Sequence, residues 1–286
     1  MATDLLIKDG NTWWLSPDIW VVPSTDPNDP PGVPVAGTTN YVWGRIKNKG
    51  ETSVENVRVN FYWSNPATGV LRSNSSLIGS AFVSLGANEE KEILCINAWR
   101  PTIVNDGHEC LVAEAIHFSD PLPPPLPDAF NPPRYEQIAQ RNLEVIELSE
   151  MMKFVMLPIQ VSADNRSNKI VTIKIEEAKK IDDELMTYLV NYHQIPKHLK
   201  LKQQLTSLGL AKAEDAKKIC ENVKTYTELN LELSKDTACK IFLAMEKKEK
   251  TEEGFQLIHV TEHSDGKLLG GISFIVYSTN HKKTRL

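Results

Sequence analysis

Residues 57–63 alternate strictly between apolar and polar side chains, and this alternation constrains the fold more than any other feature of the sequence. The apolar members of the alternation are Val57, Val59, Phe61 and Trp63. A period of two residues is typical of a strand that buries one face. In the preceding segment Val42, Gly44 and Ile46 share one face while Tyr41, Trp43 and Arg45 share the other, and Asn48-Lys-Gly50 supplies a turn signal after them. The two segments therefore predict a pair of long strands at the centre of an antiparallel sheet.

The rest of the first half has short apolar stretches separated by turn signals, with no helical period. Turn signals lie at Ser64–Gly69, Leu85–Glu90 and Asp106-Gly107. Two short strands are expected before the second turn, at Ser76–Ser80 and Ala81–Leu85. Short strands with turns every ~8–12 residues are typical of antiparallel sandwiches. We therefore expect an all-β fold in this half.

The order of these motifs resembles that of the CARDB domains, which are bacterial Ig-like modules. The motifs that carry the resemblance are Asp18-Ile-Trp-Val-Val22, Asn48-Lys-Gly50, Leu85-Gly-Ala-Asn-Glu89 and Gln137-Ile-Ala-Gln-Arg-Asn142, the last of which enters a strand at Leu143–Leu148. The resemblance covers about residues 15–148 and implies an Ig-like sandwich. The family name implies cell adhesion, but modules of this kind are also appended to many unrelated exported proteins. A Pro-rich insert at residues 120–133 departs from the family pattern.

The second half is also expected to be β-rich. Apolar stretches typical of strands lie at Phe154–Val161, Ile170–Ile175, Leu229–Leu233, Cys239–Met245, Phe255–Val260 and Leu268–Tyr277. Residues 181–192 have apolar side chains at helical spacing, and further helical segments are expected at Leu201–Leu208 and Ala213–Val223. We therefore predict two tandem Ig-like antiparallel β-sandwich domains, residues 1–150 and 151–286, the second with a helical insertion at about residues 179–224.

The two halves differ in charge and in aromatic content, which supports this division. Residues 1–150 contain 10 Lys and Arg against 19 Asp and Glu, a net charge of −9, whereas residues 151–286 contain 22 against 18, a net charge of +4. All six Trp residues lie within the first hundred positions. Solvated surfaces are the simplest interpretation of the charge difference, and an acidic partner bound to the basic half is the alternative.

Neither a membrane span nor a Sec signal peptide is expected. No apolar run approaches the ~18 residues that span a bilayer. Met1–Asp9 lacks both a positively charged start and a long apolar core. We therefore expect a protein that is either cytoplasmic or exported without a conventional leader. The four cysteines are expected to be buried thiols, with a Cys95–Cys110 disulfide as the alternative.

No motif in the sequence predicts catalysis or a cofactor, because GxSxG, HExxH and phosphate-loop patterns are all missing. Packing is the simpler explanation for the pairs His108/Cys110 and His259/His263, and the loop Asp residues lack the spacing of a calcium loop. In the Lys-rich stretch at residues 179–218, acids interleave with the lysines and the Tyr residues fall on the apolar face. We therefore expect no catalytic residue, no metal or cofactor site and no nucleic-acid partner.

Aromatic residues in excess of one core are the candidate binding residues. Tyr41 and Trp43 share the strand face opposite Val42, and one core does not easily bury both faces of a strand. The other candidates are Trp13, Trp14, Trp20, Pro123, Pro124 and Pro125. The spare aromatics are covered by the N-terminal segment, covered by the second domain, or exposed as a surface for a partner or a second copy. The Pro-rich insert is a stiff spacer or lid, or else a ligand for an aromatic groove.

The sequence favours a non-enzymatic protein-interaction or adhesion module built of tandem bacterial Ig-like domains. An accessory or targeting component of an exported hydrolase or toxin system is the alternative, and an unrecognised hydrolase is a third hypothesis. A protein partner or self-association is the expected mode of binding, and a glycan is a further ligand class that the sequence leaves open.

Overall fold

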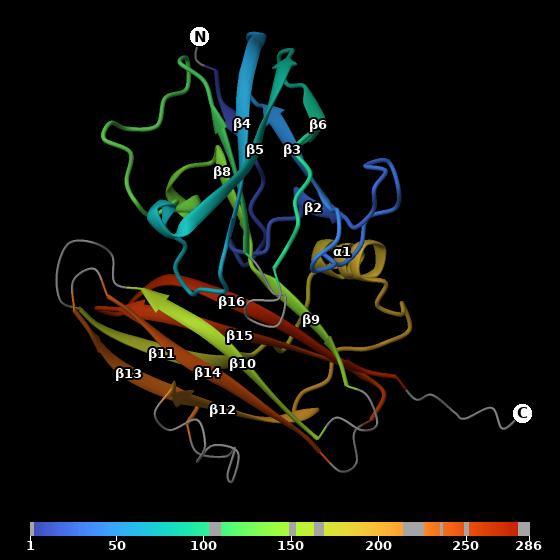
Figure 1. Ribbon diagram of the computed structural model, residues 1–286, viewed down its shortest axis with the longest axis vertical. Coiled ribbons are helices and arrows are strands. Elements are labelled where there is room, and N and C mark those ends of the chain that lie inside the picture. The colour runs from blue at the N-terminus through green and yellow to red at the C-terminus, as the bar shows by residue number, and fades with distance from the viewer. Residues whose placement is uncertain are drawn as a thin grey trace, which may run out of the picture. The chain divides into compact units, whose positions relative to one another are not determined.

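The structure is a computed structural model that describes residues 3–102, 110–148, 153–162, 169–213, 226–234, 237–248 and 252–279 (Figure 1). Its residues form two compact units. The first unit consists of Met1–Pro66, Val70–Asn142 and Asp182–Gln194, and the second consists of Ala67–Gly69, Leu143–Ile181 and Ile195–Leu286. None of the helices in the described ranges is long and apolar enough to cross a membrane.

The first unit is a sandwich of two antiparallel sheets. In one sheet, β3 (Tyr41–Asn48) pairs with β1 (Leu5–Leu6), β2 (Ile19–Val22) and β6 (Glu90–Leu94). The other sheet has the spatial order β5 (Ser75–Leu85), β4 (Val54–Ser64), β7 (Cys110–Ile116) and β8 (Ile138–Arg141). Side chains from both sheets form one core, so the predicted sandwich is confirmed for this unit.

The alternation in β4 places its apolar side chains in that core. Val57, Val59 and Phe61 are fully buried. The Phe61 ring lies against Gly44 of β3, where a Cβ atom would approach the ring to 3.0 Å. Burial of one such apolar side chain contributes about 1.5–3 kcal/mol to stability. The period of two residues therefore indicates the strand, and the apolar side chains that it places in the core stabilise the packing of the two sheets.

Asn48 joins the two turn motifs of the first half. Its buried side-chain amide donates to the Thr52 carbonyl at 2.7 Å and to the Gly86 carbonyl at 2.9 Å. Its Oδ1 accepts a hydrogen bond from the Gly50 amide at 3.0 Å. A buried amide with all these partners fixes the turns that it connects. The turn motifs on which the CARDB resemblance rests thus have a structural role in this chain.

The second unit is also built of two sheets around one core. A three-stranded sheet has the order β10 (Phe154–Ser162), β14 (Ala238–Lys247) and β12 (Thr206–Lys212). A five-stranded sheet has the order β13 (Glu228–Leu233), β11 (Lys169–Glu177), β15 (Gly254–Ser264), β16 (Lys267–Ser278) and β9 (Leu143–Glu147). Only the β9–β16 pair is parallel among the described strands. Apolar residues of both sheets form the core, which confirms the second predicted sandwich.

The first sandwich ends one strand earlier than predicted, because β9 belongs to the second unit. The sequence places Leu143–Leu148 as its last strand, but β9 pairs with β16 of the second unit. Strand β8, which pairs with β7, is the last strand of the first unit. Asn142 lies between β8 and β9, is fully buried, and donates its backbone amide to the Trp14 carbonyl at 2.9 Å. The chain thus passes from one unit to the other across a single residue that carries no turn signal.

The predicted helical insertion contains one α-helix in the described residues. Its first segment is helix α1 (Asp183–His193), whose N-cap residue Asp182 accepts a hydrogen bond from the Leu185 amide at 2.7 Å. The helix ends at Gln194, which has a left-handed backbone conformation. Helix α1 belongs to the first unit, although it lies between β11 and β12 of the second unit in the sequence. The first unit is therefore completed by a helix beyond the predicted boundary at residue 150.

The expectation of a helix at Leu201–Leu208 was wrong, because β12 begins at Thr206. Leucines at positions 201, 205 and 208 have helical spacing, which misled the prediction. In the structure Leu210 is fully buried in the core of the second unit, and the strand pairs with β14. Tertiary pairing outweighs a weak local helical preference. The helix expected at Ala213–Val223 lies almost entirely outside the described residues.

Candidate functional site

Helix α1 covers the outer face of the sheet that contains β2 and β3. The covered side chains are Trp20, Val22 and Trp43, and the helix contributes Tyr188 and Tyr192. Trp20, Val22 and Tyr188 are buried. We refer to Trp20, Trp43, Tyr188 and Tyr192 as the aromatic cluster. The strand face that the sequence leaves without a cover is thus buried by a helix from the second half of the sequence.

The rings of the aromatic cluster pack as a continuous series. Trp20 and Trp43 are stacked, with centroids 6.2 Å apart and an interplanar angle of 5°. Trp20 lies 5.9 Å from Tyr192, which is stacked on Tyr188 at 4.4 Å. The Trp43 indole also donates to the Pro27 carbonyl at 3.0 Å. Aromatic pairs at such distances add about 0.5–1.5 kcal/mol beyond the burial of area, so the cluster holds the helix to the sheet.

Two arginines pack against rings of the aromatic cluster. The Arg45 guanidinium carbon is 5.5 Å from the Trp20 ring centroid, and that of Arg141 is 3.1 Å from the Tyr188 centroid. Arg45 also pairs with Asp18 at 3.2 Å and with Glu92 at 2.9 Å. Cation–π contacts are strongest where the cation is desolvated. The Arg141 contact is therefore the stronger of the two.

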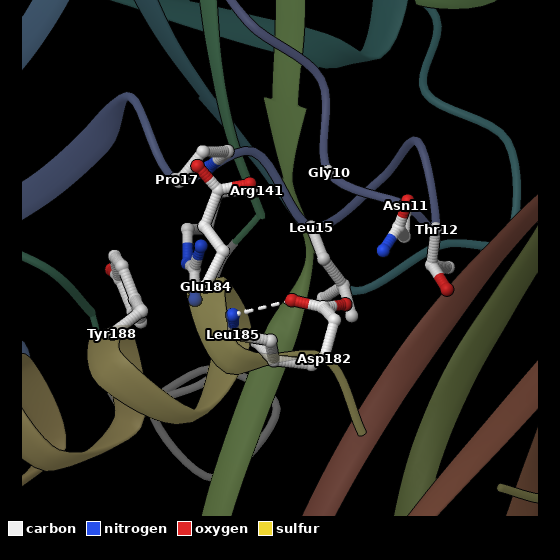
Figure 2. Close-up of a pocket in the computed structure, with 10 residues that line it drawn as sticks. All are labelled: Gly10, Asn11, Thr12, Leu15, Pro17, Arg141, Asp182, Glu184, Leu185 and Tyr188. Carbon is white, nitrogen blue, oxygen red and sulfur yellow. Dashed lines mark hydrogen bonds between the residues drawn. The ribbon is translucent and has the colours of Figure 1, made fainter. Parts of the chain in front are cut away.

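A small pocket lies beside Arg141, at the start of helix α1 (Figure 2). The loop residues Asn11 and Thr12 lie on one side of it and the helix residues Leu185 and Tyr188 on the other (Figure 2). Its volume is about 20 Å³, which is room for about one water molecule. The pocket is therefore too small to hold an organic substrate.

Arg141 is buried without a carboxylate partner within the described part of the chain. It is 6% exposed, its Nη1 donates to the Ser16 carbonyl, and its Nη2 has no hydrogen-bond partner among the described residues. Burial lowers the pKa of the Arg141 guanidinium to about 10. His193 lies nearby, and burial together with the positive charge of Arg141 lowers the pKa of its imidazole to about 3. His193 is therefore neutral at physiological pH, whereas Arg141 is charged.

The predicted binding residues differ in exposure: the aromatic residues are buried or partly buried, and the prolines of the loop are exposed. Trp14 and Trp20 are buried, while Trp13, Tyr41 and Trp43 are partly buried. Trp13 packs edge-on against Trp14, with centroids 5.3 Å apart. The loop residues Pro123, Pro124 and Pro125 are exposed. Of these aromatic residues, Trp20 and Trp43 pack against α1.

The Pro-rich insert folds over the outer face of the other sheet of the first unit. Phe130 is fully buried and forms a cluster with Val112 of β7 and Ile138 of β8. Tyr62 of β4 packs against Phe130 with ring centroids 5.1 Å apart. This arrangement corresponds to a lid, which is one of the roles that the sequence analysis gave for the insert. Both outer faces of the first sandwich thus carry a covering segment.

A buried ion pair fastens the insert to the sheet. Glu114 of β7 is 1% exposed and accepts two hydrogen bonds from Arg72, at 2.5 Å and 3.0 Å. Arg72 Nε donates to the Pro127 carbonyl at 3.0 Å, and its guanidinium carbon lies 4.2 Å from the Phe130 centroid. The bidentate pair joins three separate segments of the chain, because Arg72 precedes β5, Glu114 lies in β7 and Pro127 belongs to the insert. Such a pair fixes geometry as well as contributing energy.

Strand β5 is a feature that the sequence analysis missed. The two short strands expected at Ser76–Ser80 and Ala81–Leu85 form one strand of 11 residues, with Ile78 as an extra residue where the register with β4 shifts. Among the described residues β5 pairs only with β4, so it is an edge strand. Leu77 and Phe82 are 55% and 67% exposed. An 11-residue run without a charged residue or a proline was the signal available in the sequence.

An open cavity of about 470 Å³ lies in the second unit. Its lining residues are Ile175, Glu177, Gln204, Thr206, Ser207, Leu208, Thr227 and Lys248. Glu177 accepts a hydrogen bond from the Gln204 amide at 2.8 Å, and Lys248 Nζ donates to Gln204 Oε1 at 3.3 Å. No described lining residue is a histidine or a cysteine.

The His259–Ser273 pair and the thiols of Cys95 and Cys110 are shielded from solvent, whereas His198 is exposed and the free Cys239 is only partly buried. The His259 ring lies 2.8 Å from Ser273 Oγ, but Ser273 is fully buried, and burial lowers the pKa of His259 to about 4. Cys95 and Cys110 are free and buried, so the alternative disulfide is not formed. Burial raises the pKa of both thiols. Within the described ranges, no group of three or more His, Cys, Asp or Glu could hold a metal ion. His108 and Cys220 lie outside the described residues.

No protein-family model matches the chain, and no curated protein matches it in sequence. Among solved structures, the chain is similar to the CARDB domain of a Pyrococcus furiosus protein in complex with di-metal ions, with 18% identity over 49% of this chain and 85% of that one and a TM-score of 0.28. It is also similar to the CupB6 tip adhesin of Pseudomonas aeruginosa, with 9% identity over 97% and 98% of the two chains and a TM-score of 0.25. The third similarity is to CfaE, the adhesive subunit of the CFA/I fimbria of enterotoxigenic Escherichia coli, with 10% identity over 98% and 94% and a TM-score of 0.23.

A CARDB domain is thus among the structures to which the chain is similar, as the turn motifs of the first half predicted. Identities and TM-scores at this level carry no argument about function. The fold class rests on the two pairs of sheets described above.

Proposed function

We propose that this protein is a non-enzymatic interaction module that binds a partner protein along the edge strand β5. The observation that carries the proposal is an 11-residue edge strand with two exposed apolar side chains, Leu77 and Phe82. An unpaired strand edge offers a row of backbone donors and acceptors to an extended segment of another chain. Side chains that alternate along the strand then supply specificity.

The other edge strands of the first unit support this choice by contrast. Strand β6 carries the charged run Glu90-Lys-Glu92, and charges on an edge strand discourage pairing with another chain. The edge of β8 is occupied, because the Ser16 amide donates to the Gln140 carbonyl at 3.0 Å and Leu15 bridges to Arg141. Strand β2 has four residues, and its Val21 carbonyl accepts from the Gly32 amide at 2.9 Å. Strand β5 is the long edge of this unit whose own residues are uncharged, although Lys91 Nζ donates to its Ser84 carbonyl at 2.8 Å and the Asn97 side chain lies against Gly79.

The two cover segments support the proposal further. Helix α1 buries the outer face of one sheet and the Pro-rich insert buries most of the apolar residues on the other. Trp14 and Trp20, two of the aromatic residues that the sequence offered as a binding surface, are buried. By contrast, Leu77 and Phe82 of β5 are exposed, and exposed apolar groups of this kind mark interaction sites.

A capture experiment with matched variants tests the proposal. The whole chain is immobilised as wild type, as Phe82→Lys and as Phe118→Lys, and bound proteins from the native host are quantified by mass spectrometry. Phe118 is 87% exposed in a turn outside β5, so its substitution controls for the loss of an exposed Phe. We expect a set of proteins retained by the wild type and by Phe118→Lys but lost from Phe82→Lys. Equal capture by all three forms would contradict a binding role for β5.

A further inference from the structure

We infer that the segment which fits the β5 edge is β5 of a second copy of this chain, paired antiparallel about a two-fold axis at Phe82. The inference rests on the proposed function and names its partner. In this register Gly79–Leu85 of one copy lies opposite Leu85–Gly79 of the other. The two four-stranded sheets β5-β4-β7-β8 then become one continuous sheet.

The sequence of β5 has the symmetry that such pairing requires. Ser80-Ala-Phe-Val-Ser84 follows the pattern serine, aliphatic residue, phenylalanine, aliphatic residue, serine from either end, with Ala81 and Val83 at the related aliphatic positions. About an axis at Phe82, Ser80 faces Ser84 of the other copy, and Ala81 faces Val83. A two-fold interface is self-complementary, since each residue meets the residue related to it by the axis. A strand that binds an unrelated partner has no need of this symmetry.

In this register the core-facing and the outward-facing side of β5 in one copy also continue into the same sides of β5 in the other copy. Ala81 and Val83 pack towards the core of the first unit. Phe82 lies on the outer face, opposite Arg58 of β4. In an antiparallel pair, directly opposed side chains lie on the same face of the sheet. The register at Phe82 therefore puts core-facing residues opposite core-facing residues, and it brings the two exposed Phe82 side chains together.

The charges near β5 permit the contact, although the copies repel each other at long range. Strand β5 itself is uncharged, so the axis brings no like charges together within it. Two cations lie beside it: Arg58 faces Phe82, and Lys91, which pairs with Glu89 at 3.1 Å, donates to the Ser84 carbonyl at 2.8 Å. Residues 1–150 have a net charge of −9. Because salt screens repulsion between distant surface charges, self-association should strengthen as the ionic strength rises.

The other edge of the same sheet limits assembly to a closed dimer. Residues 14–16 occupy the edge of β8 through the contacts of Leu15 and Ser16 described above. Head-to-tail pairing of β5 with β8 of the next copy would lead to an open chain of molecules. Since β8 is covered, the β5 edge has only its own counterpart to pair with in this sheet, once the Lys91 side chain leaves the Ser84 carbonyl.

The test measures the molar mass of the purified full-length chain by sedimentation from about 1 µM to about 300 µM, the range of weak and transient interfaces. The variants are Phe82→Lys, Phe82→Glu and an equimolar mixture of the two. Phe118→Lys, Phe118→Glu and their mixture are the controls. We expect a concentration-dependent wild-type dimer that each Phe82 variant weakens at least tenfold. The mixture of Phe82 variants should restore association, because a lysine then faces a glutamate across the axis. The Phe118 variants should behave as the wild type.

Two results would overturn the inference. A wild-type chain that stays monomeric over the whole concentration range excludes the dimer. If Phe82→Lys nevertheless fails to capture host proteins that the wild type retains, the proposed interaction role of β5 stands without self-association. A dimer that both Phe82 variants leave intact, or that their mixture fails to restore, shows that the axis does not lie at Phe82. If, in addition, capture by Phe82→Lys equals that by the wild type, the proposed function fails as well.

Discussion

The guanidinium carbon of Arg141 lies 3.1 Å from the centroid of the Tyr188 ring. Arg141 ends β8, and Tyr188 belongs to helix α1, which the chain reaches only after β9, β10 and β11. Both residues are buried. The contact therefore completes the first unit with a segment that follows three strands of the second unit, and the stability of the first unit should depend on that segment.

Tyr188→Ala should destabilise the first unit by about 3–5 kcal/mol, as expected for the loss of a large buried ring. Tyr188→Phe keeps the ring and loses the hydrogen bond from the hydroxyl to the Ile19 carbonyl at 3.2 Å, which costs about 1 kcal/mol. All six Trp residues belong to the first unit, so Trp fluorescence during urea unfolding reports on this unit. Equal, small effects of the two substitutions would show that α1 does not support the first unit.

Trp14→Ala should lower stability much more than Trp13→Ala. Trp14 is buried, and truncation of a buried Trp costs about 3–5 kcal/mol, whereas Trp13 is only partly buried. The interface hypothesis drawn from the sequence expects instead that loss of both rings leaves the melting temperature nearly unchanged. Thermal melts of the two single variants, followed by circular dichroism, distinguish these outcomes.

Arg72→Ala should destabilise the first unit by about 3 kcal/mol or more, because it leaves the buried Glu114 carboxylate without its cation. The double variant Arg72→Met with Glu114→Leu removes both charges and should recover most of that loss. Urea unfolding of the single and double variants provides the comparison. A double variant as unstable as Arg72→Ala would mean that the insert is held by some other contact.

Asp9 should make the chain less stable as the pH rises. Burial, together with the nearby charge of Glu136, raises the pKa of its carboxyl from 3.8 to about 7, and its Oδ1 is buried with no hydrogen-bond partner among the described residues. Between pH 4 and pH 7 the folded state then binds more protons than the unfolded state, so this group lowers the free energy of unfolding as the pH increases.

Asp9→Asn should remove that slope. The variant is expected to be more stable than the wild type at pH 8, by an amount on the order of 2 kcal/mol given the partial exposure of the group, and to differ little at pH 4. The difference between the two proteins isolates Asp9, because the opposite effect of buried His193, which lowers stability as the pH falls below 6.5, is common to both. A constant difference between pH 4 and pH 8 would contradict the raised pKa.

The sandwiches could be predicted because their signal is local. A period of two residues at 57–63 is visible in any short window, and so are the turn motifs around Asn48. The start of helix α1 was visible for the same reason, since its acids and apolar residues recur within a few turns. These local patterns predict which residues form a strand or helix and which face of that element is buried.

The cover of the aromatic cluster could not be predicted, because it depends on a contact between distant segments. The pattern of Trp20 and Trp43 shows that a second apolar face exists, but nothing local shows that Tyr188 and Tyr192 cover it. The free edge of β5 is a similar case. Whether a strand lies at an edge depends on the order of strands in the sheet, and that order is a property of the whole unit.

Hydrogen exchange of the β5 amides at two protein concentrations tests the central claim most directly. Peptides that cover Ser75–Leu85 are compared with peptides that cover the charged edge strand β6 (Glu90–Leu94), at about 1 µM and about 300 µM of the full chain. Pairing of β5 with a second copy predicts slower exchange in Gly79–Leu85 at the higher concentration, with no change in β6. Identical exchange of the β5 peptides at both concentrations would contradict pairing at this edge.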